Sequence, residues 1–210
     1  MKIAIIGAGN VGGTLGKGWT KAGDEVVFGV RNPSDPKLKE LLAAGGARAK
    51  AAGLRDAAAS AEVVTLTVPW EAAQDAIKSA GNVAGKILQD CTNPLKPDLS
   101  GMTHGFTASG GEQVATWAKG ARVVKIFNTT GAPNMANPVY KEGLSVMLYC
   151  GDDSAAKKTA AQLASDLGFD PYDVGPLQEA RLLEPFALIW IHLALLQKLG
   201  PNFAFRIMKR

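Results

Sequence analysis

The chain has 210 residues and a net charge of +4 at pH 7, with 47% hydrophobic and 20% charged residues. This length suits a single α/β domain, alone or with a small appendage, and the composition is typical of a globular protein and not of a disordered one. The 23 basic and 19 acidic residues form no dense basic cluster, which argues against a nucleic-acid partner.

The sequence also argues against a membrane or secreted protein. The longest apolar run, residues 186–196, is interrupted by His192 and is shorter than the roughly 20 residues that a spanning helix needs. No basic segment precedes an apolar one at the start of the chain, so we expect no signal peptide. Cys91 and Cys150 are far apart and lack metal-ligand spacing. We interpret them as buried free thiols in a reducing, cytoplasmic environment, and we expect no metal site.

The first predicted element is a glycine-rich turn between a strand and a helix. The apolar residues 3–6 predict the strand, and Gly7, Gly9 and Gly12 follow it at the G-x-G-x-x-G spacing of dinucleotide-binding turns. In such a turn the first glycine permits the sharp bend, the second lets a pyrophosphate approach the backbone, and the third lets helix and strand pack closely. The helix predicted over 11–22 would direct its N–H groups and positive dipole end at the phosphates. The motif therefore predicts a bound dinucleotide.

The loop after the second predicted strand, residues 25–30, indicates which dinucleotide binds. Proteins that bind NAD carry an acidic residue at this place, about 20 positions past the turn. Here the loop carries Arg31, Asn32 and Ser34 instead. Arg31 can pair with a 2′-phosphate, and the other two can donate hydrogen bonds to it. The loop predicts NADP; the alternative is that Arg31 is a solvated charge and that Asp35 only caps the next helix.

Strands and helices then alternate through the middle of the chain. We expect helices at 36–44, 56–61 and 71–79, and strands at 47–51, 62–68 and 86–90. The strand at 62–68 is β-branched almost throughout, as buried parallel strands are. The carboxyl ends of such strands line the ligand crevice of a doubly wound sheet, so the turn at Val68 and Pro69 should face the cofactor. The turn at Asn93 and Pro94, after the next strand, falls on the same side.

The rest of the chain completes an α/β pattern. Residues 97–107 lack periodicity and are predicted as a loop, and Ser109 with Glu112 forms a capping box for a helix over 112–119. Further elements are predicted as strands at 122–127, 145–150 and 169–174 and a helix at 154–167. The predicted fold class is α/β, a doubly wound parallel Rossmann sheet with a small C-terminal part. We divide the chain into an NADP-binding domain, 1–150, and a C-terminal substrate and dimerisation part, 151–210.

The last predicted element is a long apolar helix over residues 176–199. It has almost no polar face, and a helix that is apolar all round must be buried on all sides. In so short a chain a second subunit supplies that burial most easily, so we predict a homodimer through this helix. We interpret His192, within the helix, as a hydrogen-bonded core residue and not as a catalytic one.

Several stretches of the sequence carry a family resemblance. They are GAGNVGGTLG at the start, VPWEAA at 68–73, KIFNTTGAP at 125–133, CGDDSAAKK at 150–158 and DVGPLQEARLLEP at 173–185. These stretches resemble the NADPH-dependent coenzyme F420 reductases, or F420:NADP oxidoreductases, and the likeness covers nearly the whole chain. The segment 182–205, LLEPFALIWIHLALLQKLGPNFAF, is also similar to the cytosolic oxidoreductase domain of the STEAP metalloreductases.

The resemblance implies a Rossmann domain that binds NADPH along its glycine-rich edge, with a deazaflavin or a similar flavin ring stacked near the nicotinamide. Carried over by position, it implies NADP contacts at Ala8, Gly9, Asn10, Val11, Arg31, Val68, Pro69, Asn93 and Pro94. It implies contacts to the second ring at Asn128, Thr129 and Ala132.

Hydride transfer between two such rings needs no protein nucleophile and no strong general acid, so we predict no catalytic side chain. Asn128 or Thr129 is expected to hydrogen-bond the acceptor ring as it gains charge. Three alternatives stay open: an NADPH-dependent flavin or ferric reductase, a dehydrogenase of small hydroxy acids, and a non-catalytic NADP(H) sensor.

Overall fold

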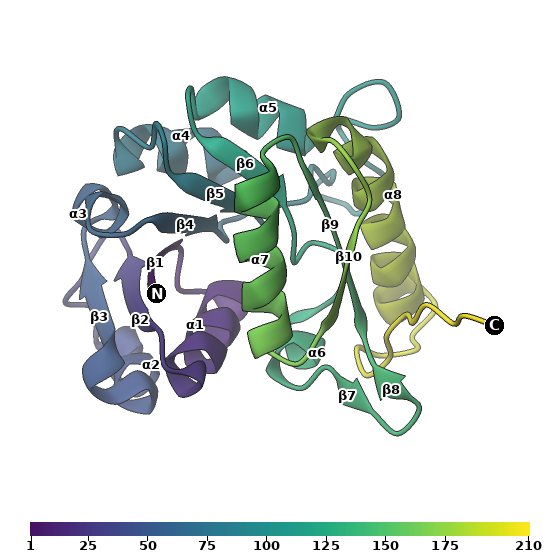
Figure 1. Cartoon of the computed structure of the whole chain (residues 1–210), viewed down its shortest axis with the longest axis horizontal. Helices are drawn as coiled ribbons and strands as arrows, with labels where there is room; N and C mark the ends of the chain where they lie inside the picture. The colour runs from purple at the N-terminus through teal and green to yellow at the C-terminus, as the bar shows by residue number, and fades with distance from the viewer.

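The computed structural model describes all residues, 1–210, and is built on one eight-stranded sheet (Figure 1). Its first six strands are β1 (Lys2–Ile6), β2 (Glu25–Gly29), β3 (Ala49–Ala52), β4 (Val63–Leu66), β5 (Ile87–Asp90) and β6 (Arg122–Lys125). They are parallel and lie in the order β3-β2-β1-β4-β5-β6, which is the order of a doubly wound dinucleotide-binding sheet. The predicted Rossmann architecture is therefore confirmed for this part of the sheet.

The sheet is not parallel throughout, and here the prediction is corrected. Strand β9 (Val146–Gly151) runs antiparallel to β6, and β10 (Asp170–Asp173) is parallel to β9. Between β6 and β9 the chain forms only the short helix α6 (Ala132–Ala136) and the hairpin β7 (Val139–Tyr140) and β8 (Gly143–Leu144). A parallel connection needs a crossover segment, usually a helix that returns the chain to the other edge of the sheet. Because no such helix is present, β9 enters the sheet from the carboxyl ends of the parallel strands.

Helices cover both faces of the sheet. Six of them are α1 (Asn10–Ala22), α2 (Lys39–Gly45), α3 (Leu54–Ala59), α4 (Trp70–Ala80), α5 (Gly110–Trp117) and α7 (Ser154–Asp166). Short 3₁₀ turns occur at Pro36–Leu38, Gly46–Arg48 and Leu177–Glu179. Ile3 and Ile5 belong to one core cluster, with side chains of α1, α2 and α7. The alternate residues of β1 belong to a second cluster, with α3, α4 and α5. Strand β1 is thus buried on both faces, as expected for a central parallel strand.

Predicted caps explain two of the helix boundaries. The Ser109 hydroxyl accepts from the Glu112 N–H at 3.1 Å, which confirms Ser109 as the N-cap; the Glu112 carboxylate accepts from the Ser109 hydroxyl at 2.7 Å and not from its backbone N–H, so the second half of the predicted capping box differs. Helix α5 accordingly begins at Gly110, two residues before the predicted start. Asp35 accepts from the Lys37 N–H and caps the turn that begins at Pro36.

The helical segment predicted over 176–199 is present but shorter and irregular: helical turns run without a break from Leu177 to Leu196. Helix α8 covers only Ala180–Ile191 and continues as a π-helical turn over His192–Leu196. Nor is the segment buried on all sides: Leu182 and Ile189 are 57% and 53% exposed, because only one face of α8 packs on the protein. His192 is exposed and contacts Gln197, so it is not a core histidine.

The segment after α8 folds back over the protein. The indole N–H of Trp190 donates to the Phe203 carbonyl at 3.0 Å, and the two rings stack with centroids 5.3 Å apart. The Phe205 carbonyl accepts from the Val146 N–H, at the start of β9. These contacts hold residues 203–205 against α8 and the start of β9, and the last residues extend away from the protein (Figure 1).

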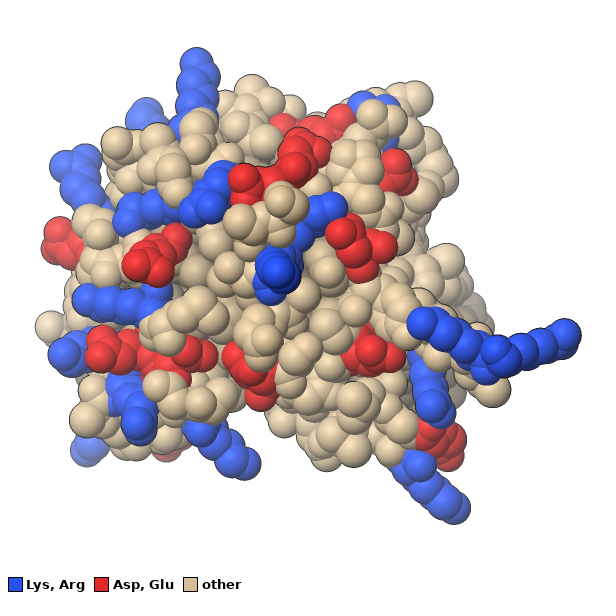
Figure 2. All heavy atoms as spheres, in the orientation of Figure 1, with Lys and Arg blue, Asp and Glu red and all other residues tan.

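The surface and the cysteines have ordinary features. Figure 2 shows Lys and Arg side chains interspersed with Asp and Glu, without a broad patch of one sign on the face it draws. None of the helices has the length and hydrophobicity needed to cross a membrane. Cys91 and Cys150 are buried free thiols, as predicted. Burial raises the pKa of both thiols, to about 12 for Cys150, so neither is a reactive thiolate at neutral pH.

The glycine-rich turn joins β1 to α1, and each glycine of the motif has a different environment. Gly7 has a φ of +106°, which side chains disfavour, and its N–H donates to the Gly29 carbonyl at the end of β2. A Cβ on Gly12 would lie 2.2 Å from the Gly7 carbonyl oxygen and 2.5 Å from the Thr67 hydroxyl. Gly9 has no atom within 4 Å of the Cβ position. Gly7 and Gly12 are therefore needed for the fold, whereas Gly9 leaves the backbone open to solvent.

These environments predict opposite effects of two alanine substitutions in one motif. Gly12→Ala should lower the free energy of unfolding by about 3 kcal/mol or more, because its methyl group meets backbone that cannot move aside. Gly9→Ala should leave the stability within about 0.5 kcal/mol of wild type. Urea unfolding followed by circular dichroism measures both values. Equal stabilities of the two variants would contradict the packing role of Gly12.

Candidate functional site

The turn between β1 and α1 offers unpaired hydrogen-bond donors. The first backbone hydrogen bond of α1 joins the Gly13 N–H to the Gly9 carbonyl, and no hydrogen bond uses the N–H groups of Asn10, Val11 or Gly12. No side chain caps the helix. Gly9 and Asn10 are exposed, and Ala8 and Val11 are half-buried. A phosphate fits this turn, because bare backbone at Gly9, free N–H groups and the positive end of the helix converge there.

The loop with Arg31 begins beside this turn. Gly29, at the end of β2, pairs with Ile6 and accepts the Gly7 hydrogen bond, so the two loops start next to one another. The Arg31 side chain is exposed and makes no hydrogen bond or ion pair, which leaves its guanidinium available to a ligand. Asn32 accepts from the Ser34 N–H at 3.1 Å, which gives the exposed loop a defined shape.

The turn after β4 is tied to the glycine-rich turn. The Thr67 hydroxyl lies 3.1 Å from the Ile6 carbonyl and 3.0 Å from the Gly7 carbonyl. Val68 and Pro69 follow at once, half-buried and exposed respectively, before α4 begins at Trp70. The structure thus places this turn and the glycine-rich turn together at the carboxyl edge of the sheet, as the sequence predicts.

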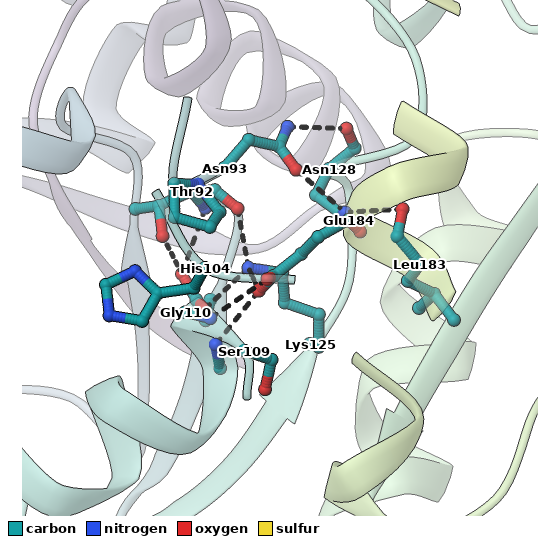
Figure 3. A network of polar contacts seen from close by, with 12 residues as sticks. Thr92, Asn93, His104, Ser109, Gly110, Lys125, Asn128, Leu183 and Glu184 are labelled. Atoms are coloured by element: carbon teal, nitrogen blue, oxygen red, sulfur yellow. Dashed lines mark hydrogen bonds and ion pairs between the residues drawn. The ribbon is translucent and has the colours of Figure 1, made fainter. Parts of the chain in front are cut away.

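Two asparagines, Asn93 and Asn128, are hydrogen-bonded to each other (Figure 3). The sequence assigns Asn93 to the NADP site and Asn128 to the second ring. The Asn93 side-chain N–H₂ donates to the Asn128 backbone carbonyl at 2.9 Å, and the Asn128 N–H₂ donates to Asn93 Oδ1 at 3.0 Å. Asn128 Oδ1 is buried without a hydrogen-bond partner. The preceding residue, Phe127, has a φ of +60°. A buried, unpartnered acceptor next to an unfavourable backbone conformation makes this turn a candidate binding site.

The other predicted residues of this region lie close by in the chain but differ in exposure. Pro94 is buried. Thr129 is also buried, and its hydroxyl is directed at the Met147 sulfur, 4.0 Å away. Ala132 is half-buried and starts α6. Of the three residues predicted to contact a second ring, Asn128 is therefore the one with an unused buried hydrogen-bonding atom.

Sequence reasoning missed a buried group of charges beneath this pair. Lys125 Nζ lies 2.9 Å from an Asp90 oxygen and 2.8 Å from a Glu184 oxygen, and all three side chains are fully buried. Burial alone would lower the pKa of Lys125, but the two carboxylates outweigh it and raise the pKa above its ordinary value. The sequence does contain a sign of this group: Lys125 lies inside the apolar strand RVVKIF, and Glu184 lies inside an apolar helix. Only the fold shows that they meet.

Comparisons with known proteins show which family the chain belongs to. Residues 2–94 match the family described as NADP oxidoreductase coenzyme F420-dependent. The F420-dependent NADP reductase of Methanothermobacter thermautotrophicus is 31% identical, over 92% of this chain and 89% of the relative. Metalloreductase STEAP3 of Rattus norvegicus is 32% identical over 89% of this chain, but the chain spans only 36% of the length of that protein.

The likeness extends to the complete three-dimensional structure. The crystal structure of a candidate F420-dependent NADP reductase from Arthrobacter sp. FB24 superposes with a TM-score of 0.89. It is 33% identical and covers 100% of both chains, including α8 and the C-terminal segment. With similarity along the whole chain in both sequence and fold, the protein belongs to the family of F420-dependent NADP oxidoreductases.

Proposed function

We propose that this protein transfers a hydride between NADPH and a deazaflavin, coenzyme F420. The observation that carries the proposal is an open glycine-rich turn at the carboxyl edge of the sheet, in a chain that matches an F420-dependent NADP reductase over 92% of its length. When bound, NADPH supplies the hydride and the deazaflavin receives it. The protein itself binds the two molecules and orients their rings.

The residues assigned to NADP occupy three neighbouring loops. The pyrophosphate is assigned to the backbone from Gly7 to Gly12, where free N–H groups and the helix dipole favour an anion. Arg31 is assigned to the 2′-phosphate, since its guanidinium is exposed and unpaired and can bind a phosphate in bidentate fashion. Asn32 and Ser34 lie in the same exposed loop. The remaining contacts are assigned to Val68, Pro69, Asn93 and Pro94, in the turns after β4 and β5.

The acceptor ring is assigned to the turn after β6. Asn128, Thr129 and Ala132 lie there, next to the Asn93 turn. No side chain is assigned as acid, base or nucleophile, because hydride transfer between two held rings requires alignment and not proton transfer by the protein. Water must be excluded from between the rings, and the Asn93–Asn128 pair, half-buried at Asn93 and buried at Asn128, provides an uncharged surface for them.

A flavin is the second candidate acceptor. It is supported by the 32% identity to part of metalloreductase STEAP3. In that case the protein would act as an NADPH-dependent flavin or ferric reductase. The same NADP site would serve both reactions, so the two proposals differ only in the second ring.

Acceptor identity can be tested by mixing the purified protein with NADPH and F420, FMN or FAD, and following the nicotinamide absorbance. We expect oxidation of NADPH with F420 at a rate at least about tenfold higher than with either flavin. Gly9→Ala is the matched control, because it should fold like wild type and yet block approach of the pyrophosphate. Faster oxidation with FMN or FAD would favour the flavin reductase, and oxidation with none would refute both.

Cofactor preference can be tested with Arg31→Glu. The substitution removes a charge-assisted contact and adds repulsion, so affinity for NADPH should fall roughly 10- to 100-fold while affinity for NADH does not fall. Titration calorimetry measures both. Lys21→Glu changes the net charge equally at the far end of α1 and serves as the control. An unchanged preference for NADPH in Arg31→Glu would show that Arg31 is only a solvated charge.

We also propose that the protein is a homodimer formed through α8 and the residues that follow it, within the C-terminal part 151–210. Five leucine and isoleucine side chains of this segment are more than half exposed, namely Leu182, Ile189, Leu195, Leu196 and Leu199. An apolar patch of this kind is unfavourable in water and is a common feature of subunit interfaces.

The double variant Leu182→Glu/Ile189→Glu should therefore sediment as a monomer at micromolar concentration, whereas wild type sediments as a dimer. The reason is that like charges would be buried opposite one another at a twofold interface. Analytical ultracentrifugation measures the mass, and Lys158→Glu on α7 is the control. Wild-type protein that sediments as a monomer would contradict the proposed dimer.

A further inference from the structure

The buried group of Lys125, Asp90 and Glu184 is not explained by folding alone. Two carboxylates and one ammonium group are fully buried, and their desolvation costs free energy that apolar side chains would not incur. The carboxylates are well satisfied: Glu184 accepts from the N–H groups of Gly110 and Gly111, both at 2.9 Å. The three charges cost free energy to bury, yet their hydrogen bonds are satisfied and they lie next to the proposed ring site. We therefore ask which side chain of that site they orient.

On the sheet side, the network holds the turn that carries Asn93. Asp90 Oδ1 accepts from the Thr92 N–H at 2.9 Å and from the Thr92 hydroxyl at 2.7 Å. Lys125 Nζ donates to the Thr92 carbonyl. The residue immediately before Asn93 is thus held at both its N–H and its C=O, so the backbone that directs the Asn93 side chain is fixed.

On the helix side, the network holds α8 against Asn128. Glu184 binds Lys125, and the carbonyl of the adjacent Leu183 accepts from the Asn128 N–H₂ at 3.3 Å (Figure 3). The Asn128 amide therefore donates to two acceptors, Asn93 Oδ1 and the Leu183 carbonyl. Rotation of the amide by 180° would place its oxygen against both of them. The orientation of Asn128 Oδ1 is consequently set by contacts from the turn after β5 and from α8 together.

That oxygen is the atom left without a partner. Asn128 is 4% exposed, and its Oδ1 has no hydrogen bond. A buried acceptor of this kind costs about 1–3 kcal/mol until a donor reaches it. An N–H on a bound ring would complete its hydrogen bonding.

We propose that Lys125, Asp90 and Glu184 are positioning residues that orient Asn128 so that its Oδ1 accepts an N–H from a bound redox ring. This inference rests on the proposed function and refines its site. The recognised chemistry is an amide or imide N–H, which both the carboxamide of nicotinamide and the pyrimidine ring of a deazaflavin carry. Asn128 touches the ligand, whereas the charged residues act through it.

The ligand contact is tested by binding measurements on wild type and Asn128→Leu. One pair of ligands is NADPH and its 3-acetylpyridine analogue, which lacks the carboxamide N–H. The other is 5-deazariboflavin and its N3-methyl derivative, which lacks the ring N–H. Wild type should bind the parent of one pair about tenfold more tightly than its analogue, and Asn128→Leu should lose that preference.

The pair that shows the preference identifies the ring. If wild type shows no preference within either pair, the proposed hydrogen bond is absent and the inference is overturned, whether or not Asn128→Leu folds. A preference that persists in a folded Asn128→Leu variant overturns it as well.

The positioning role is tested by Glu184→Gln, measured alone and combined with Asn128→Leu. Alone, the substitution should reduce the affinity for the preferred parent ligand about fivefold. In the Asn128→Leu background it should have no further effect, because a residue that acts through Asn128 is not additive with it. Equal losses in the two backgrounds would show a merely structural role. Should Glu184→Gln unfold, as thermal melting would show, Asp90→Asn perturbs the same lysine from β5.

A matched control separates orientation from helix docking. Glu112 and Arg181 form a second ion pair between α5 and α8, 2.7 Å apart and partly exposed at the surface. Glu112→Gln should weaken helix docking and leave the ligand preference unchanged; the same loss as in Glu184→Gln would overturn the positioning role. These measurements involve no turnover, so a protein that shows the ligand preference and fails to reduce F420 would refute the proposed function alone.

Discussion

The close packing of α1 on the end of β1 is the constraint on which the site depends. Gly12 brings the helix so near to the sheet that any side chain there would meet the Gly7 carbonyl, and Thr67 fastens β4 to the same point. This contact aims the unpaired N–H groups of the first helical turn over the carboxyl edge. Without this close packing, α1 would have to tilt away from the sheet. The free N–H groups of α1, the positive end of its dipole and the turns after β2 and β4 would then no longer lie around one ligand.

A second constraint connects the C-terminal third of the chain to this edge. Helix α8 contributes Glu184 to a buried ion network under β5 and β6, and the Leu183 carbonyl to the orientation of Asn128. The sheet and the last helix are therefore joined by buried polar contacts at the place proposed for the two rings. This coupling accounts for a buried charge group that is a poor source of stability by itself.

Much of the fold was predictable from the sequence, because strands and helices follow from local periodicity and the glycine spacing reports a local turn. The antiparallel entry of β9 was not predictable, since it depends on a connection of short elements without a clear pattern. The extent of α8 was also mispredicted. Its leucines indicated a helix buried on every side, yet several of them are exposed. Hydrophobicity alone cannot tell a core face from a surface left for a partner.

The sequence by itself determined the six parallel strands, the dinucleotide turn and the loop with Arg31, because these rest on residues a few positions apart. Only the tertiary structure decided what surrounds the site that we propose for the second ring. The Asn93–Asn128 pair joins residues 35 positions apart, and Glu184 reaches an N–H 74 positions away. Such contacts arise from the packing of β5, β6, α5 and α8, and single-sequence patterns carry no record of which distant polar groups will meet.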